Sequence, residues 1–253
     1  MPMSIDEVHR VLRELDDLRY AAGNLDEALQ RIVQSTHGLF AVDGAGLMLV
    51  DPDQLLRNVA VSDERVHDLE GLQIEHGEGP CVDAFEQKAM ADADDLAGED
   101  RWPLFSEAAV GRGMRAVLAS PIPYNQHAIG VVVVFSADVR PWSPEGKLAL
   151  IAFTDLAALT IANTMQSEER GELAEQLQHA LDSRVVIEQA KGVLVARTGS
   201  SEREAFERLR RQARDQRRPV VDVAAEVIRT ARGPEPDGGD RRGSQSEEFS
   251  ADV

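Results

Sequence analysis

Hydrophobic residues follow two different spacings along the chain, and each spacing predicts a different kind of element. Apolar side chains recur every three or four residues over 4–18 and again over 24–33, which predicts two amphipathic helices. Residues 43–51 and 54–61 are instead short apolar runs joined by an Asp-Pro-Asp turn, which predicts a β-hairpin. The chain is therefore expected to begin with two helices and to continue into a sheet.

The middle of the chain combines a glycine-rich turn, buried strands and a long helix. The turn HGEGP at 76–80 precedes a short helix predicted over 81–87. The runs 114–122 and 128–135 are apolar enough to be central strands of a buried sheet. A helical pattern then extends from 143 to about 196. These elements predict an α+β domain in which helices flank an antiparallel sheet.

Three helices are predicted near the end of the chain. Ser201 and Glu204 form a capping box for the second of them, and a proline separates the second from the third. A three-helix unit of this size buries only a small core. We expect an α+β domain at 1–166, an all-α three-helix domain at 167–232 joined to it by a long helix or coiled coil, and a disordered acidic tail at 233–253.

Net charge divides the chain at a similar point. The whole sequence carries a formal charge of −18, but residues 172–232 carry +2, against −16 for the residues before them and −4 for those after. An acidic body disfavours loose phosphate binding, so any nucleic-acid contact should be local to the helical domain.

The location of the protein is predicted from three features. Its longest apolar stretches fall short of the roughly 20 residues that cross a bilayer. Its first residues, MPMSIDEVHR, do not have the pattern of a signal peptide. A single cysteine, Cys81, excludes an internal disulfide and fits a reducing compartment. We therefore expect a cytoplasmic protein without membrane segments.

Three stretches of the first domain, DGAGLMLVD at 43–51, GEGPCVDAFEQ at 77–87 and SPIPYNQHAIGVVVVFS at 120–136, together resemble a GAF domain. This resemblance implies a sensor of a small molecule or of redox state, with its ligand pocket on one face of a central sheet. It also implies dimerisation through the terminal helices. The fold does not name the ligand, because one fold hosts many sites.

Two residues of this domain are candidates for sensing. Cys81 is expected at the N-terminus of a short helix, where the helix dipole and free amides favour a thiolate. The alternative is a buried cysteine that packs helix against sheet. His76 is a candidate haem ligand, with a surface histidine as the alternative.

The sequence contains no pattern typical of a metal site or of an enzyme. Its histidines are scattered and the acidic run at 92–100 lacks EF-hand spacing, so no metal site is expected. It has no P-loop, dinucleotide fingerprint or nucleophile elbow. We therefore expect no catalytic residues and no cofactor, apart from an unidentified small ligand of the first domain.

The second domain contains a set of residues at regular spacing, namely Arg184, the run IEQAKG at 187–192, the pattern EAFxxLR at 204–210 and Asp222-Val223-Ala224. With these residues it resembles an ANTAR domain, the RNA-binding output module of bacterial transcription antitermination regulators. The resemblance implies binding to RNA stem-loops, in tandem, and a function in transcription antitermination.

Six residues are predicted to contact RNA. The spacing of Arg184, Glu188 and Lys191 places them on one face of a helix, and arginine side chains suit both phosphates and unstacked bases. A glycine would let RNA or a neighbouring helix approach the backbone. The predicted set is Arg184, Glu188, Lys191, Gly192, Arg210 and Arg214. From charge alone, these side chains could equally form surface ion pairs on a solvated face.

An apolar stripe along the long helix predicts a parallel coiled-coil homodimer. The stripe consists of Leu156, Leu159, Met165, Leu173, Leu177 and Leu181.

Three alternatives to an RNA-binding regulator remain open: a DNA-binding regulator, a module whose C-terminal helices bind protein, and a haem- or thiol-based sensor with its activity in the first domain.

Overall fold

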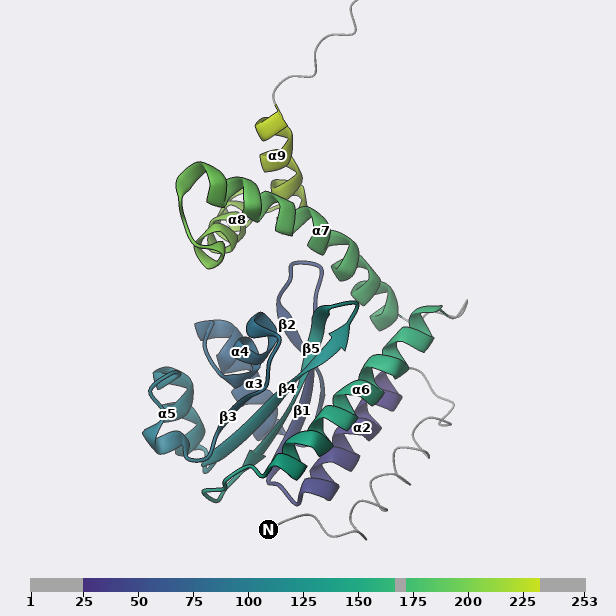
Figure 1. Ribbon diagram of the computed structural model, residues 1–253, viewed down its shortest axis with the longest axis vertical. Coiled ribbons are helices and arrows are strands. Elements are labelled where there is room, and N and C mark those ends of the chain that lie inside the picture. Colours follow the sequence, from purple (N-terminus) through teal and green to yellow (C-terminus); the bar gives the residue numbers. More distant parts are fainter. Residues whose placement is uncertain (1–24, 167–171, 233–253) are drawn as a thin grey trace, which may run out of the picture. The chain divides into compact units, whose positions relative to one another are not determined.

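The computed structural model describes residues 25–166 and 172–232, and the chain divides into two compact units between Val185 and Val186. The first unit is built on a five-stranded sheet. Its strands are β1 (Gly44–Val50), β2 (Leu56–Val61), β3 (Ala91–Ala93), β4 (Ala116–Tyr124) and β5 (His127–Ser136). Their order is β2-β1-β5-β4-β3, and every neighbouring pair is antiparallel (Figure 1).

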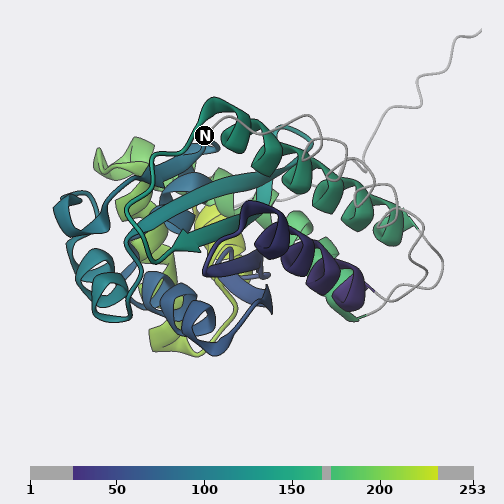
Figure 2. The same cartoon turned by 90° about the horizontal axis from the view of Figure 1, so that it is seen from below.

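Helices cover both faces of this sheet. One face carries α2 (Leu25–Phe40) and α6 (Pro144–Gln166), and the other carries α3 (Glu64–His76), α4 (Pro80–Gln87) and α5 (Pro103–Gly111) (Figures 1 and 2). A short 3-10 helix, η1 (Leu96–Gly98), follows β3. With a helical layer on each side, the central strands have no solvated face.

Alternation along the strands sends successive side chains into two separate cores. Leu47 and Val132 join the core under α2 and α6, whereas Met48 and Val133 join the core under α3, α4 and α5. All four side chains are fully buried. This explains why β1 and β5 are continuous apolar runs rather than alternating ones.

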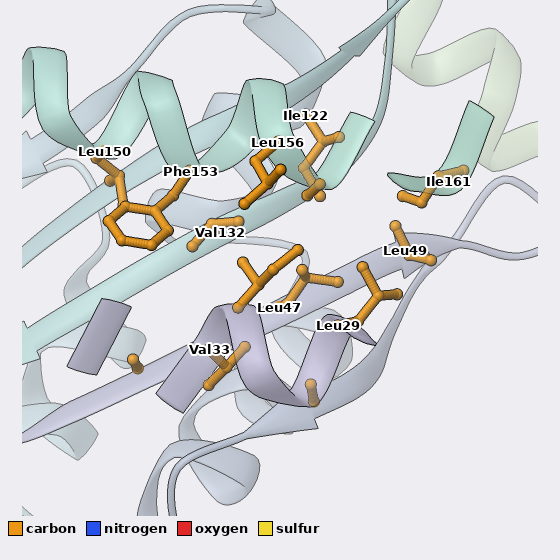
Figure 3. Packing of buried hydrophobic residues seen from close by; sticks show 14 of the residues in the cluster. Leu29, Val33, Leu47, Leu49, Ile122, Val132, Leu150, Phe153, Leu156 and Ile161 are labelled. Atoms are coloured by element: carbon orange, nitrogen blue, oxygen red, sulfur yellow. The ribbon is translucent and has the colours of Figure 1, made fainter. Parts of the chain in front are cut away.

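The core under α2 and α6 is filled mainly by aliphatic side chains, together with the rings of Phe40, Trp142 and Phe153. Figure 3 shows Leu29 and Val33 of α2 and Leu150, Phe153 and Leu156 of α6 packed around the side chains of the central strands. Burying an aliphatic or aromatic side chain of this size stabilises a fold by about 1.5–3 kcal/mol.

Among the described residues one helix, α6, is long and apolar enough to span a bilayer. Its apolar composition has a simpler cause, since Leu150, Phe153, Ala157 and Ile161 are fully buried in the core of the first unit. Packing on the sheet accounts for these residues, whereas Leu148, Ile151 and Leu159 of the same helix are exposed.

The next helix, α7 (Glu172–Thr198), contributes to both units. Ala174, Leu177 and Ala180 are buried in the core that α2 and α6 share, and Gln54 Nε2 donates to Ala180 O at 2.7 Å. The first half of α7 is therefore part of the first unit.

This packing corrects the predicted coiled-coil stripe. Leu156, Met165 and Leu177 are buried inside the first unit, and Leu173 and Leu181 pack against the same core. Leu159 alone among the stripe residues is strongly exposed, at 46%. Side chains already used in the chain's own core cannot form the seam of a dimer.

The second unit consists of the end of α7, α8 (Glu202–Gln216) and α9 (Val220–Arg232). Its core is small and is made by nine buried residues, namely Ile187, Ala190, Leu194, Ala205, Leu209, Ala213, Val220, Val223 and Ala224. The predicted capping box is present: Ser201 Oγ accepts from Glu204 N at 3.3 Å, and Ser201 N donates to Glu204 Oε2 at 2.8 Å. The predicted fold class, an α+β domain followed by three helices, is confirmed.

The sequence predicted the central strands well and the helices over the second face poorly. The runs 43–51 and 54–61 correspond to β1 and β2, and 114–122 and 128–135 correspond to β4 and β5. Helices α3 and α5 were not predicted. The predicted helix over 4–18 and the predicted disordered tail lie outside the described residues.

Leu177→Ala tests whether the first half of α7 belongs to the first unit. Because Leu177 is 1% exposed, its truncation should lower the free energy of unfolding of that unit by about 2–5 kcal/mol in urea denaturation. Leu159→Ala, at an exposed position of α6, is the matched control and should cost less than about 1 kcal/mol. Equal small effects of the two variants would show that α7 does not stabilise the first unit.

Candidate functional site

Between α3, α4 and the sheet lies a cluster of buried polar side chains. Gln73 of α3 accepts a hydrogen bond from the Cys81 backbone N–H at 2.8 Å, and its Nε2 donates to Cys81 Sγ at 3.4 Å. Gly79 is required at the turn into α4, because its φ is +139° and an added Cβ would collide with the side chain of Gln73. The amide of Gln73 therefore fixes the start of α4.

Glu70 lies one turn before Gln73 on α3 and is fully buried. Within the described residues, neither of its carboxyl oxygens has a hydrogen-bond partner. Desolvation by burial raises the pKa of Glu70 well above its usual value, which favours the neutral acid. The carboxyl group has room on the sheet only because residue 46 is a glycine, since a Cβ there would collide with Glu70 Oε1.

The thiol of Cys81 is fully buried and neutral. Burial raises its pKa well above the usual value, the neighbouring Glu70 raises it further, and the bond from Gln73 lowers it only in part. The position of Cys81 at the start of α4 is as predicted, because it is the second residue of that helix. A thiolate was expected at this position, but burial favours the neutral thiol, because desolvation outweighs the helix dipole at a buried position.

His76 is not part of this cluster. It is the last residue of α3 and is exposed, and the left-handed Gly77 ends the helix immediately after it. Sequence reasoning missed Glu70 and Gln73. A signal was available, because both occupy the buried face of α3 that Val66 and Leu69 also form, where polar residues are unusual.

In the second unit, three of the predicted residues are held by internal ion pairs. Lys191 Nζ lies 2.9 Å from Glu188 Oε1 and 3.8 Å from Glu202 Oε2, which connects α7 to α8. Arg210 pairs with Glu207 at 2.8 Å. Lys191 Nζ lies 6.0 Å from the centre of the Phe206 ring, and the guanidinium carbon of Arg210 lies 5.9 Å from it. These side chains support the joint between the two helices.

The exposed side of α8 carries a band of arginines. It contains the predicted Arg214 and also Arg208 and Arg211, and Arg217 follows at the C-cap of the helix; we call these four residues the α8 arginine band. Within the part of the chain that the structure describes, none of these four forms an ion pair, whereas Arg218 pairs with Glu226 at 2.7 Å. Three guanidinium groups on the helix and one at its end provide sites for phosphate oxygens or for the faces of unstacked bases.

Gly192 lines a shallow groove of about 470 Å³ between α7 and α9. The groove is lined by Gln189, Gly192, Val193, Ala196, Ile228 and Ala231. A Cβ added at Gly192 would meet no atom within 4 Å. The packing of the described residues therefore does not require a glycine here, although a glycine inside a helix costs about 1 kcal/mol relative to alanine.

Arg184 contacts a different set of residues from those that Glu188 and Lys191 contact. Its Nη1 donates to Ala128 O of β5 at 3.0 Å, and its guanidinium lies 6.0 Å from the ring of Phe85 on α4. All three groups belong to the first unit. The sequence predicted one RNA-binding face for these residues. In the structure Arg184 contacts the sheet, whereas Lys191 pairs with Glu188 on α7 and with Glu202 on α8.

Comparisons with known proteins agree with both parts of this structure. One family model, the GAF domain, matches residues 24–161, and a second, the ANTAR domain, matches residues 175–228. GAF and ANTAR domains are sensor and RNA-binding domains rather than catalytic domains. A comparison with curated proteins gives no match.

Solved structures with a similar fold include GAF domains. The GAF domain of an Acinetobacter phosphoenolpyruvate-protein phosphotransferase is 17% identical with a TM-score of 0.50, over 64% of this chain and 96% of that one. The corresponding domain from Coxiella burnetii is 19% identical with a TM-score of 0.50, over 61% and 94%. The chromophore-binding domain of a bacteriophytochrome from R. palustris is 15% identical with a TM-score of 0.50, over 64% and 63%. These similarities support the fold alone.

The first family model spans more than half of the 253 residues, and the second follows it along the chain. The chain belongs to the GAF family and continues into an ANTAR domain, so it is a GAF-ANTAR protein.

Proposed function

We propose that this GAF-ANTAR protein is a cytoplasmic, signal-responsive regulator of transcription antitermination. Its ANTAR domain binds nascent RNA stem-loops, in tandem when the protein is a homodimer, and its GAF domain senses a small molecule. The observation that carries this proposal is the α8 arginine band, because the four guanidinium groups are exposed and make no ion pair among the described residues. The protein acts by binding and not as an enzyme.

RNA suits this surface better than duplex DNA does. A helix that reads the major groove presents polar side chains to base edges. Val220, Val223 and Ala224 of α9 are instead buried in the core, and Glu226 on the same helix is engaged by Arg218. An arginine-rich surface without a base-reading helix fits a folded RNA with exposed loop bases.

The sensor communicates with the ANTAR domain through α7. The first half of this helix is fixed to the GAF domain by Leu177 in the core, by the bond from Gln54 and by the bond from Arg184 to Ala128 O. A shift of the sensor between two states therefore changes the position or order of α7, and with it the availability of Arg184 for RNA.

The RNA-binding surface is tested with the double variant Arg211→Ala/Arg214→Ala. Binding of the full chain to a two-hairpin RNA should weaken, and the slope of log K against log salt should become less steep by about two, because two phosphate contacts are lost. The measurement is an RNA titration at several salt concentrations. Arg31→Ala, at an exposed arginine of α2, should bind as the parent does. An unchanged double variant would exclude the α8 arginine band.

The coupling is tested by Gln54→Ala, which removes one side-chain bond to α7. We expect RNA affinity without signal to rise by up to about fivefold, because loss of a hydrogen bond worth about 1 kcal/mol frees α7 and Arg184. Gln30→Ala is the matched control, since Gln30 donates to Val61 O at 2.9 Å within the same domain but does not touch α7. Equal RNA affinities for both variants would contradict signalling through α7.

A redox signal at Cys81 is the alternative input, and the structure disfavours it. A buried neutral thiol should react with a disulfide reagent at least about 100-fold more slowly in the native protein than in the urea-unfolded chain, because reaction requires opening of the domain. The absorbance of the released thiolate follows this reaction. Rapid labelling of the native protein would favour redox sensing instead.

A further inference from the structure

The buried polar cluster of the GAF domain has unsatisfied acceptors. In the described residues, Glu70 Oε1, Glu70 Oε2 and Asn58 Oδ1 are buried and accept no hydrogen bond. Asn58 lies on β2, and its Nδ2 donates to His67 O of α3 at 3.1 Å, so both side chains belong to the layer between α3 and the sheet. Leaving such groups without partners is costly in a folded protein, and each case requires an explanation.

The domain does not supply the missing donors itself. The side chain of Gln73 is next to Glu70 on α3, but its amide is used by the backbone and thiol of Cys81. The remaining neighbours are apolar, with Val66 and Leu69 on the buried face of α3 and Met48 in the same core. A molecule that satisfies this site must therefore bring hydrogen-bond donors. Burial favours the neutral acid at Glu70 when nothing is bound, whereas a bound cation would favour the ionised carboxylate, so the ligand is expected to carry a positive charge.

We propose that the GAF domain binds a small organic cation with N–H donors, a protonated primary amine or a guanidine, with Glu70 as its anchor and Asn58 as a second acceptor. This inference rests on the proposed small-molecule sensing and names the class of ligand.

A metal cation does not suit the same atoms. Divalent cations take six or more oxygen ligands or a cluster of histidine, cysteine and carboxylate side chains. In the part of the chain that the structure describes, no three such side chains are grouped. An ammonium or guanidinium group needs only a few directed acceptors, which is what Glu70 and Asn58 offer.

Gly46 provides the space that the Glu70 carboxyl occupies. The carboxyl lies where a side chain on β1 would otherwise be, so the glycine and the acid are matched across the layer. An apolar side chain at position 70 would join the surrounding core without unsatisfied atoms, so packing alone does not explain the acid. A ligand that explains why residue 70 is a buried acid also explains why residue 46, which gives the acid its space, is a glycine.

Contacts lead from this site to α7. Glu70 neighbours Gln73 on α3, Gln73 binds Cys81, and Phe85 lies one turn after Cys81 on α4, beneath the Arg184 guanidinium. A cation that draws the Glu70 carboxyl toward itself changes the first contact in this series. The route explains how a buried ligand can affect Arg184.

The test uses the full chain and a panel of chloride salts at equal ionic strength: methylammonium, 1,4-diaminobutane and guanidinium at low millimolar concentration, with tetramethylammonium and potassium as controls. Calorimetry gives the dissociation constant, and thermal unfolding gives the shift in Tm. At least one probe with N–H donors should bind and raise the Tm. Tetramethylammonium, a cation without donors, should not.

Variants of the anchor decide the assignment. Glu70→Gln keeps the shape and removes the charge, and it should weaken binding by about tenfold or more. Glu70→Leu should abolish binding while it raises the Tm of the unliganded protein, which shows that the variant is folded. The proposal is overturned if no donor-bearing probe binds, if tetramethylammonium binds equally well, or if Glu70→Gln binds as the parent does.

RNA binding of the same proteins separates this proposal from the function on which it rests. Unliganded Glu70→Leu should still bind the two-hairpin RNA, because Glu70 is remote in sequence and contacts from the α8 arginine band. Amine binding in a parent that does not bind RNA would leave the ligand class intact and remove the antitermination function. RNA binding without amine binding would leave the antitermination function intact and remove the proposed ligand class.

Discussion

The packing of the first half of α7 on the GAF domain is the constraint on which the organisation of the protein depends. Ala174, Leu177 and Ala180 are buried with α2 and α6, although the ANTAR match already begins at residue 175. The structural boundary at 185/186 therefore leaves the first eleven residues of the ANTAR match, 175–185, in the first unit. Because a core tolerates only discrete rearrangements, the proposed function would have a change within the sensor passed on to this helix rather than absorbed.

The two faces of the GAF sheet differ in the side chains that they bury. The face under α2 and α6 is filled with aliphatic side chains and contains the contacts to α7. The face under α3 and α4 buries a carboxyl group, an amide and a thiol, and it leaves the carboxyl without a partner among the described residues. Natural proteins depart from good local packing mainly at functional sites, and the second face has the character of such a site.

The sequence predicted the strands because burial on both faces leaves an apolar run that no other element explains, as in Val131 to Phe135. It did not predict the polar cluster, because Glu70 and Gln73 read as ordinary surface residues of an unrecognised helix. The apolar stripe along the long helix was assigned to a dimer seam for a related reason. Periodicity shows that a face of a helix is buried, but it does not distinguish the chain's own core from a second copy.

The same limit applies to the signature of the ANTAR domain. A motif identifies residues that the domain needs, but it does not separate those that hold the helices together from those that bind RNA. Lys191 lies near Phe206 and pairs with Glu202 of α8, so its removal disturbs the joint between α7 and α8 as well as any RNA contact. Arg210 pairs with Glu207 of its own helix and lies near Phe206. Arg211 and Arg214 have no such structural role among the described residues. We therefore propose that the exposed cations of α8, more than the residues of the motif, define the surface that would bind RNA.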